Sequence, residues 1–377
     1  MPHSKLAHSQ PGLGVTTPGR RLAAAVLLAA CAVATLGGQA KRPAAPDLSR
    51  TPVQTVWPLP PDPPRVKWVA AYGSAEDIEG PTRKSALDSF KEAVLGKDRA
   101  QGGQASTRRL EKPYGVAVDS TGRVFVADSV HAAVFAFDFR QQRFLRIGSA
   151  QSQALLRIPI GLAVDARDNL YVGDNGHGTI FVFGPDLNYL GTLSKPGELV
   201  APTGLAVDSK TDRLYAVDTR RHVLVVYDLA SGRMLRRVGK KGSQPGEFGW
   251  PSGVAVGPDG LVYVSDTMNY RVQVFDRDLK VIRTFGSLGI YPGQFRRPKG
   301  IAVDRDNIVY VVDSDFNNFQ MFDSQGRPLL AVGSFGQRPG QMVLPAGIAV
   351  HGEQARIVVA EQLTHRIQVF ERVSAPR

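Results

Sequence analysis

One short pattern recurs six times in this chain at nearly constant spacing. It first appears as Gly115-Val-Ala-Val-Asp119, and its leading glycines stand at Gly115, Gly161, Gly204, Gly253, Gly300 and Gly347. Further segments follow each copy, such as Ile308-Val-Tyr-Val-Val-Asp313, in which apolar residues alternate with others. This alternation, bounded by Asp, Asn, Gly and Pro, predicts strands. Four short strands in every repeat of about 45 residues predict a propeller blade, so the sequence predicts an all-β, six-bladed β-propeller of four-stranded blades.

The glycines and turns favour the same architecture. Pro258-Asp259-Gly260 and Ser231-Gly232 are typical of the turns that join consecutive strands. The glycine that opens each inner strand predicts that neighbouring backbones approach closely near the axis of the ring.

The two chain ends predict how the ring closes. The sixth repeat reaches Arg366-Ile-Gln-Val-Phe370, and too few residues follow for a fourth strand. The segment 65–74, which precedes the first repeat, ends in Ala-Tyr-Gly-Ser74 and is similar to Thr-Phe-Gly-Ser287 at the close of the fourth repeat. We therefore expect residues 65–74 to be the closing strand of blade 6, which hides open strand edges, and residues 111–377 to form the rest of the propeller.

A long connection, residues 75–110, links this strand to the first repeat. Its segment 85–95 starts with a serine that can cap a helix and is followed by Gly96, with apolar residues at helical spacing at Leu87, Phe90, Val94 and Leu95. The sequence predicts one short amphipathic helix here, packed on the propeller rim. A cap over the channel mouth and a docking element are the alternatives.

The N-terminal region predicts export. Arg20 and Arg21 precede an apolar run, the pattern of a signal peptide over residues 1–30. The run ends in Leu-Ala-Ala-Cys31, which resembles a bacterial lipobox, and Cys31 is the only cysteine, so it cannot form an internal disulfide. We expect a lipid on Cys31 to anchor the chain to a membrane of a bacterial cell envelope, on the extracytoplasmic side, with the Pro- and Ala-rich residues 31–64 as a tether. The alternative is an uncleaved anchor, although the apolar stretch is shorter than the ~20 residues that span a bilayer.

Charge indicates the kind of partner. The formal net charge is +12, and such a basic balance favours anionic partners. Export argues against nucleic acid, so we expect a protein or an anionic glycan as the ligand of a monomeric propeller.

The segments between repeats resemble the NHL-repeat family. The resemblance rests on Pro245-Gly-Glu-Phe248, Pro292-Gly-Gln-Phe295 and Pro339-Gly-Gln-Met342, together with Asp266-Thr-Met-Asn-Tyr-Arg-Val-Gln-Val-Phe275. It covers residues 111–371 and implies that the loops from fourth to first strands and from second to third strands share one face, which usually binds ligands. The residue before each inner glycine should then lie near the channel mouth: Tyr114, Ile160, Thr203, Ser252, Lys299 and Ala346.

Basic and aromatic residues gather on this inferred face. The expected ligand-binding residues are Tyr114, Arg220, Arg221, Trp250, Tyr270, Arg296, Arg297, Lys299 and Phe316. A solvated rim without a ligand is the alternative.

The mouth residues do not resemble a catalytic site. They include no histidine, no paired carboxylates and no nucleophile with an evident base, so we expect a binding protein without catalytic residues or a cofactor. An acid begins each second-to-third loop, at Asp128, Asp174, Asp218, Asp266, Asp313 and Glu361. Six equivalent acids are typical of six equivalent turns, in which each carboxylate accepts backbone N–H bonds, rather than of a calcium site.

Histidine supplies the alternative function. His222 and His365 resemble positions at which a related propeller, peptidyl-hydroxyglycine lyase, holds zinc with histidines from separate blades. This resemblance implies a metal-dependent lyase or hydrolase, in which zinc-bound water would act as base or nucleophile.

Overall fold

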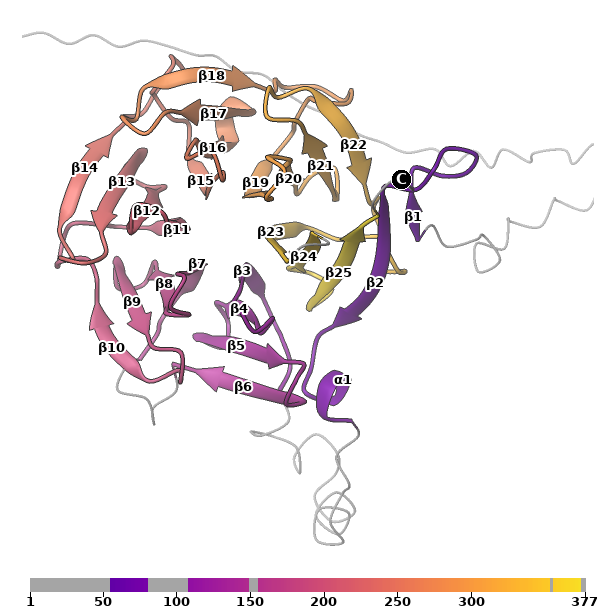
Figure 1. Ribbon diagram of the computed structural model, residues 1–377, viewed down its shortest axis with the longest axis horizontal. Coiled ribbons are helices and arrows are strands. Elements are labelled where there is room, and N and C mark those ends of the chain that lie inside the picture. Colours follow the sequence, from indigo (N-terminus) through magenta and orange to yellow (C-terminus); the bar gives the residue numbers. More distant parts are fainter. Residues whose placement is uncertain (1–54, 81–107, 149–154, 353–354, 374–377) are drawn as a thin grey trace, which may run out of the picture. The chain divides into compact units, whose positions relative to one another are not determined.

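The protein is a ring of antiparallel sheets. The computed structural model describes residues 55–80, 108–148, 155–352 and 355–373. Its strands form six sheets, arranged as blades around a central axis (Figure 1). In each blade the glycine-bearing strand lies next to the axis and the last strand lies at the rim. The predicted all-β, six-bladed propeller is confirmed.

The strands follow the predicted repeats. Blades 1 and 2 contain β3 (Pro113–Val118), β4 (Val124–Asp128), β5 (Ala133–Asp138) and β6 (Arg143–Ile147), then β7 (Pro159–Val164), β8 (Leu170–Asp174), β9 (Thr179–Phe183) and β10 (Tyr189–Thr192). Blades 3 and 4 contain β11 (Pro202–Asp208), β12 (Arg213–Asp218), β13 (Val223–Asp228) and β14 (Met234–Val238), then β15 (Pro251–Val256), β16 (Val262–Asp266), β17 (Arg271–Phe275) and β18 (Val281–Phe285). Blades 5 and 6 contain β19 (Pro298–Val303), β20 (Val309–Asp313), β21 (Asn318–Phe322) and β22 (Pro328–Val332), then β23 (Pro345–His351), β24 (Arg356–Glu361) and β25 (Arg366–Arg372).

The core lies between neighbouring blades. For example, Tyr310 and Phe319 of blade 5 pack against Ile357 and Val359 of blade 6, and all four side chains are fully buried. Alternation along the strands sends one set of side chains to each neighbouring blade, so both faces of every sheet are apolar.

The inner strands approach one another as the glycines predict. A Cβ atom added at Gly115 would lie 2.1 Å from the Ile160 carbonyl oxygen of the next blade, and one at Gly347 would lie 2.1 Å from the Tyr114 carbonyl oxygen. The other four inner glycines face the next blade in the same way, at 2.5 to 2.8 Å. Glycine is therefore what allows six inner strands to fit around the axis.

An N-terminal strand closes the ring, as expected. The strand β2 (Val66–Tyr72) pairs antiparallel with β25 from Val66↔Arg372 to Tyr72↔Ile367. A further strand, β1 (Val56–Trp57), pairs outside β2, so this sheet has five strands rather than the four expected. The Trp57 ring packs edge-on against Phe370 with ring centroids 5.7 Å apart, so β1 extends the core of blade 6.

The described part of the connection contains α1 (Glu76–Glu79), a single short turn of helix. The helix predicted at 85–95, the signal peptide, Cys31 and most of the tether lie outside the described residues, so they stay predictions. Within the described ranges, no helix combines the length and apolar character needed to cross a membrane.

Candidate binding face

One face of the ring carries the loops that the sequence indicates as ligand-binding. We call it the proline face, because its fourth-to-first loops end at the residues that open the inner strands: Pro113, Pro159, Pro202, Pro251, Pro298 and Pro345. Antiparallel pairing places the second-to-third loops on the same side, since Pro113 pairs with Asp128 and Pro298 pairs with Asp313. The remaining strand connections lie on the opposite face.

Buried carboxylates join the two kinds of loop. The Asp313 carboxylate accepts backbone N–H bonds from Arg296 and Arg297 in one loop, at 2.7 and 3.1 Å, and from Asp315 and Phe316 in the other, both at 3.1 Å. The carboxylate in blade 1, Asp128, binds both of its loops in the same way. The six acids are fully buried, and their oxygens hold loops, as the repetition predicts.

Three buried glutamines, which the repeat pattern did not predict as loop contacts, also hold these loops. In β17, Gln273 accepts the Gly246 N–H at 2.9 Å and donates to the Glu247 carbonyl oxygen at 2.7 Å. The side chains of Gln320 and Gln368 do the same for the next two loops. The sequence signal that could have predicted them is a glutamine at an otherwise apolar strand position, which recurs at nearly the same distance after each Pro-Gly segment. These clamps give the loops 240–250, 287–297 and 334–344 a fixed shape.

The channel mouth is lined by the residues that precede the inner glycines. Tyr114, Ser252 and Ala346 line a small cavity of about 50 Å³ among the inner strands. The Lys299 ammonium of blade 5 lies 5.4 Å from the centre of the Tyr114 ring of blade 1, a cation–π contact that spans blade 6. Burial, reinforced by the positive charge of Arg297, lowers the pKa of Lys299 to about 8. Burial raises the pKa of the Tyr114 hydroxyl to about 12.

The predicted arginines divide into exposed and structural groups. Arg220 and Arg296 are exposed. Arg297 forms an ion pair with Asp315 at 3.3 Å. The Arg221 guanidinium donates to the Glu198 and Gly197 carbonyl oxygens, so it fastens a loop of the proline face.

The predicted aromatic residues differ in exposure. Trp250 is 48% exposed, and its ring meets His222 edge-on at 5.3 Å. Its φ of 54° places it in the left-handed region, which is uncommon for a bulky residue. Tyr270 packs partly against the core between blades 4 and 5, and Phe316 is half-buried in the β20–β21 turn.

Exposed apolar side chains, which were not among the predicted ligand-binding residues, add to this face. They are Val130, Leu155, Ile158, Met268, Leu288, Ile290, Tyr291, Phe335 and Leu363, besides Trp250. Ile290, Tyr291 and Phe335 are each 71% exposed. In the part of the chain that the structure describes, the loops of the opposite face carry one exposed large apolar residue, Leu59 in the turn between β1 and β2.

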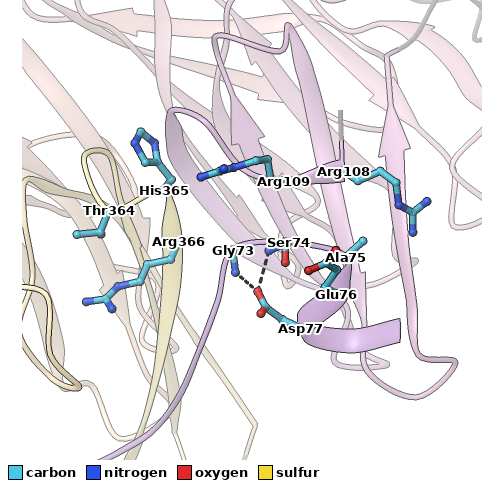
Figure 2. Close-up of a pocket in the computed structure, with 10 residues that line it drawn as sticks. All are labelled: Gly73, Ser74, Ala75, Glu76, Asp77, Arg108, Arg109, Thr364, His365 and Arg366. Carbon is cyan, nitrogen blue, oxygen red and sulfur yellow. Dashed lines mark hydrogen bonds between the residues drawn. The ribbon is translucent and has the colours of Figure 1, made fainter. Parts of the chain in front are cut away.

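A larger cavity, of about 510 Å³, lies at the seam where the ring closes. Its walls come from the end of β2, α1, Arg108–Arg109 and the β24–β25 turn, and the Arg109 side chain extends toward His365 (Figure 2). The Asp77 carboxylate accepts the Gly73 and Ser74 N–H bonds at 2.6 and 2.8 Å. This polar cavity therefore belongs to the contact between the two chain ends.

The two histidines of the zinc alternative are held by different loops. His222 is buried, with Nδ1 3.0 Å from the Phe248 carbonyl oxygen and 3.1 Å from the Trp250 backbone nitrogen. Nδ1 of His365 contacts the Glu111 carbonyl oxygen. Their blades, 3 and 6, lie on opposite sides of the ring (Figure 1). Among the residues that the structure describes, no three His, Cys, Asp or Glu side chains are grouped to hold a metal ion.

Comparisons with known proteins agree with the repeat and the fold. The NHL repeat family matches residues 156–183 and 248–275. RING finger protein nhl-1 of Caenorhabditis elegans is 43% identical over 53 residues, which are 14% of this chain and 5% of that protein. NHL repeat-containing protein 2 of Gallus gallus is 31% identical over 94 residues, which are 23% of this chain and 13% of that protein. The matches thus span only a small part of these relatives.

Solved structures share the fold at low sequence identity. Virginiamycin B lyase from Staphylococcus aureus is 13% identical with a TM-score of 0.51, over 70% of this chain and 95% of that one. A gluconolactonase from Xanthomonas campestris is 16% identical with a TM-score of 0.55, over 70% of this chain and 87% of that one. With six blades in a ring and matches to the NHL repeat in two of them, this chain is a six-bladed β-propeller that contains NHL repeats.

Proposed function

We propose that this chain is a non-catalytic binding protein, which presents its proline face to an acidic, partly apolar segment of another protein. We propose further that lipid on Cys31 tethers it to the extracytoplasmic side of a bacterial membrane. The observation that carries the binding function is the gathering of exposed apolar side chains on one face: among the described residues, the loops of the proline face carry ten and those of the opposite face carry Leu59 alone. Exposed apolar patches mark interaction sites.

Charge on the same face indicates the character of the partner. Arg220 and Arg296 are exposed among these apolar side chains, and Lys299 lies at the channel mouth. A partner that combines acidic and apolar residues would match both features, because complementary charges steer association and apolar contacts supply affinity. An anionic glycan would match the charges alone.

Charge reversal tests this function. We expect Arg220→Glu with Arg296→Glu to weaken binding of a short peptide, in which glutamate alternates with leucine, about tenfold. Fluorescence anisotropy of the labelled peptide measures the affinity. Raising the salt concentration should weaken wild-type binding too, because exposed charges are screened over ~8–10 Å.

The matched control is Arg140→Glu with Lys280→Glu, which changes net charge equally at exposed sites of the opposite face. Equal losses in both double variants would mean that only overall charge matters, and the proposed face would be wrong. Binding of heparin or alginate, without any binding of the peptide, would replace the protein partner with a glycan.

The anchor is tested separately. Cys31→Ser should release the chain from membranes or leave it unprocessed, because the thiol is the expected site of lipid attachment. Fractionation and mass spectrometry of the mature N-terminus measure both outcomes, and Ala32→Ser, which keeps the thiol, is the control. An unmodified mature N-terminus at another residue would contradict the anchor.

The alternative of a metal-dependent lyase or hydrolase has less support. His222 and His365 contact loops of different blades, and the described residues offer no grouped set of metal ligands. The likeness to virginiamycin B lyase, at 13% identity, concerns the fold. Stoichiometric zinc in the purified chain, lost on joint replacement of His222 and His365, would reverse this preference.

A further inference from the structure

Lys299 differs from the other residues of the channel mouth. Of the six mouth residues it alone can carry a positive charge. Its ammonium lies over the Tyr114 ring of blade 1, and the mouth residue of the blade between them is the small, buried Ala346.

The charges around Lys299 are unbalanced. Arg297 and Lys112 both disfavour its protonated form, and Asp315 is the nearby acid that favours it. That acid already forms the ion pair with Arg297. Within the described ranges, Lys299 has no carboxylate or carbonyl partner at hydrogen-bonding distance, so a desolvated ammonium faces the mouth with only an aromatic ring beneath it.

The serine and threonine hydroxyls of the mouth are already paired. Ser252 Oγ lies 2.7 Å from Thr267 Oγ1, which donates to the Pro298 carbonyl oxygen at 2.8 Å. Thr203 and Thr219 form the equivalent pair, and Thr219 donates to the Pro251 carbonyl oxygen at 2.6 Å. The Tyr114 hydroxyl and the Lys299 ammonium are therefore the donors that the mouth leaves available, and Lys299 is the one that can carry a positive charge.

We propose that Lys299 anchors one carboxylate of the bound partner at the mouth of the channel. This inference rests on the binding function proposed above and adds the chemistry of one central contact. The carboxylate supplies the missing anion, and the ammonium donates to it from its place over Tyr114. Arg297 and Lys112 add long-range attraction, and neighbouring apolar side chains contact the rest of the segment.

Such an anchor makes binding depend on pH. With a pKa of about 8, Lys299 is about nine-tenths protonated at pH 7 and about one-tenth protonated at pH 9. An anion binds the protonated form, so it raises the pKa of Lys299, and binding weakens as pH rises through 8. Arg297, Lys112 and Asp315 are the other charged groups near Lys299.

The first experiment follows the lysine itself. Reductive ¹³C-methylation labels the lysine amines of the purified chain, and Lys299→Arg identifies the Lys299 signal in NMR spectra. We expect that signal to titrate near pH 8 in chloride, and its midpoint to rise by about one unit in acetate at tenfold its dissociation constant and equal ionic strength. An unchanged midpoint in saturating acetate would overturn the anchor.

The second experiment uses the glutamate–leucine peptide. Lys299→Met should weaken its binding at pH 7 about tenfold. Lys299→Arg should bind equally at pH 7 and pH 9, whereas the wild-type chain should lose affinity by a similar factor over this interval. Lys280→Met, on the opposite face, should follow the wild-type pattern.

The outcomes separate this inference from the function on which it rests. If charge reversal of Arg220 and Arg296 abolishes peptide binding while Lys299→Met binds normally, the anchor is wrong and the binding face stands. If acetate raises the titration midpoint of Lys299 but no acidic peptide or protein binds the face, Lys299 holds a small anion and the proposed function is wrong. If Lys299→Met does not fold, the acetate titration and the pH profile of Lys299→Arg still test whether Lys299 anchors a carboxylate.

Discussion

Gly115→Ala should destabilise the propeller by about 3 kcal/mol, which is much more than one added methyl group usually changes. The new Cβ atom would lie 2.1 Å from the Ile160 carbonyl oxygen, and both partners are backbone in strands that are fixed on either side. The steric clash can therefore be relieved only if a whole blade shifts. Alanine also restricts the unfolded chain, a stabilising effect of about 0.4–1 kcal/mol that the clash must exceed. Urea denaturation measures the difference.

The other inner glycines supply the control. At Gly161 and Gly204 the added Cβ atom would be 2.8 Å from the facing oxygen, so alanine there should destabilise less than at Gly115 or Gly347. If alanine has the same effect at Gly115 and at Gly161, steric contact between inner strands is not what limits the ring.

Removal of the closing strand should have the second large effect. Deleting residues through Gly73 takes away β1 and β2, which exposes the edge of β25 along its pairing from Ile367 to Arg372. Phe370 loses its contacts with Trp57 and Val66 in the same core cluster. We expect a loss of roughly 5 kcal/mol or more, together with aggregation through the open edge. Thermal unfolding and light scattering measure the two effects.

Shorter deletions separate the contributions of the two strands. Deletion through Thr55 leaves β1 and β2 in place and should be tolerated, whereas deletion through Arg65 removes only β1 and should have an intermediate effect. If all three truncations unfold at one temperature, the N-terminal strands do not contribute to the stability of the ring.

The fold could be predicted because every repeat carries the same strand and turn signals independently of the others. Strand alternation, turn residues and the inner glycine occur six times, so an irregular segment in one blade does not obscure the pattern. The closing strand was found because blade 6 lacked a partner that segment 65–74 resembles. β1 could not be found, because the two residues Val56 and Trp57 stand beside prolines and show no periodicity.

The candidate face was predictable only in outline. Arg220 and Arg221 are neighbours of the same chemical type, yet one is exposed and the other fastens a loop through the Glu198 carbonyl oxygen. Leu288 and Phe295 belong to one loop, yet Leu288 is 60% exposed and Phe295 is fully buried. Loop conformation decides such differences, and it depends on the Gln320 clamp and the buried Asp313, which act over long distances in the sequence.

The order of strands in blade 6 also determines how the ring would respond to mechanical load. A pull on the chain ahead of Val56 reaches the outermost strand first and breaks its two pairs, Val56↔Lys67 and Trp57↔Val66. The force then arrives at the Val66 end of β2, where the pairing with β25 begins at Arg372 and runs to Ile367. These pairs would separate one after another, as in unzipping, rather than all at once under shear. Tension along the N-terminal segment would therefore open the ring at blade 6 while the other five blades remain folded. The pairing of β2 with β25 is thus the part of the ring that yields first under force.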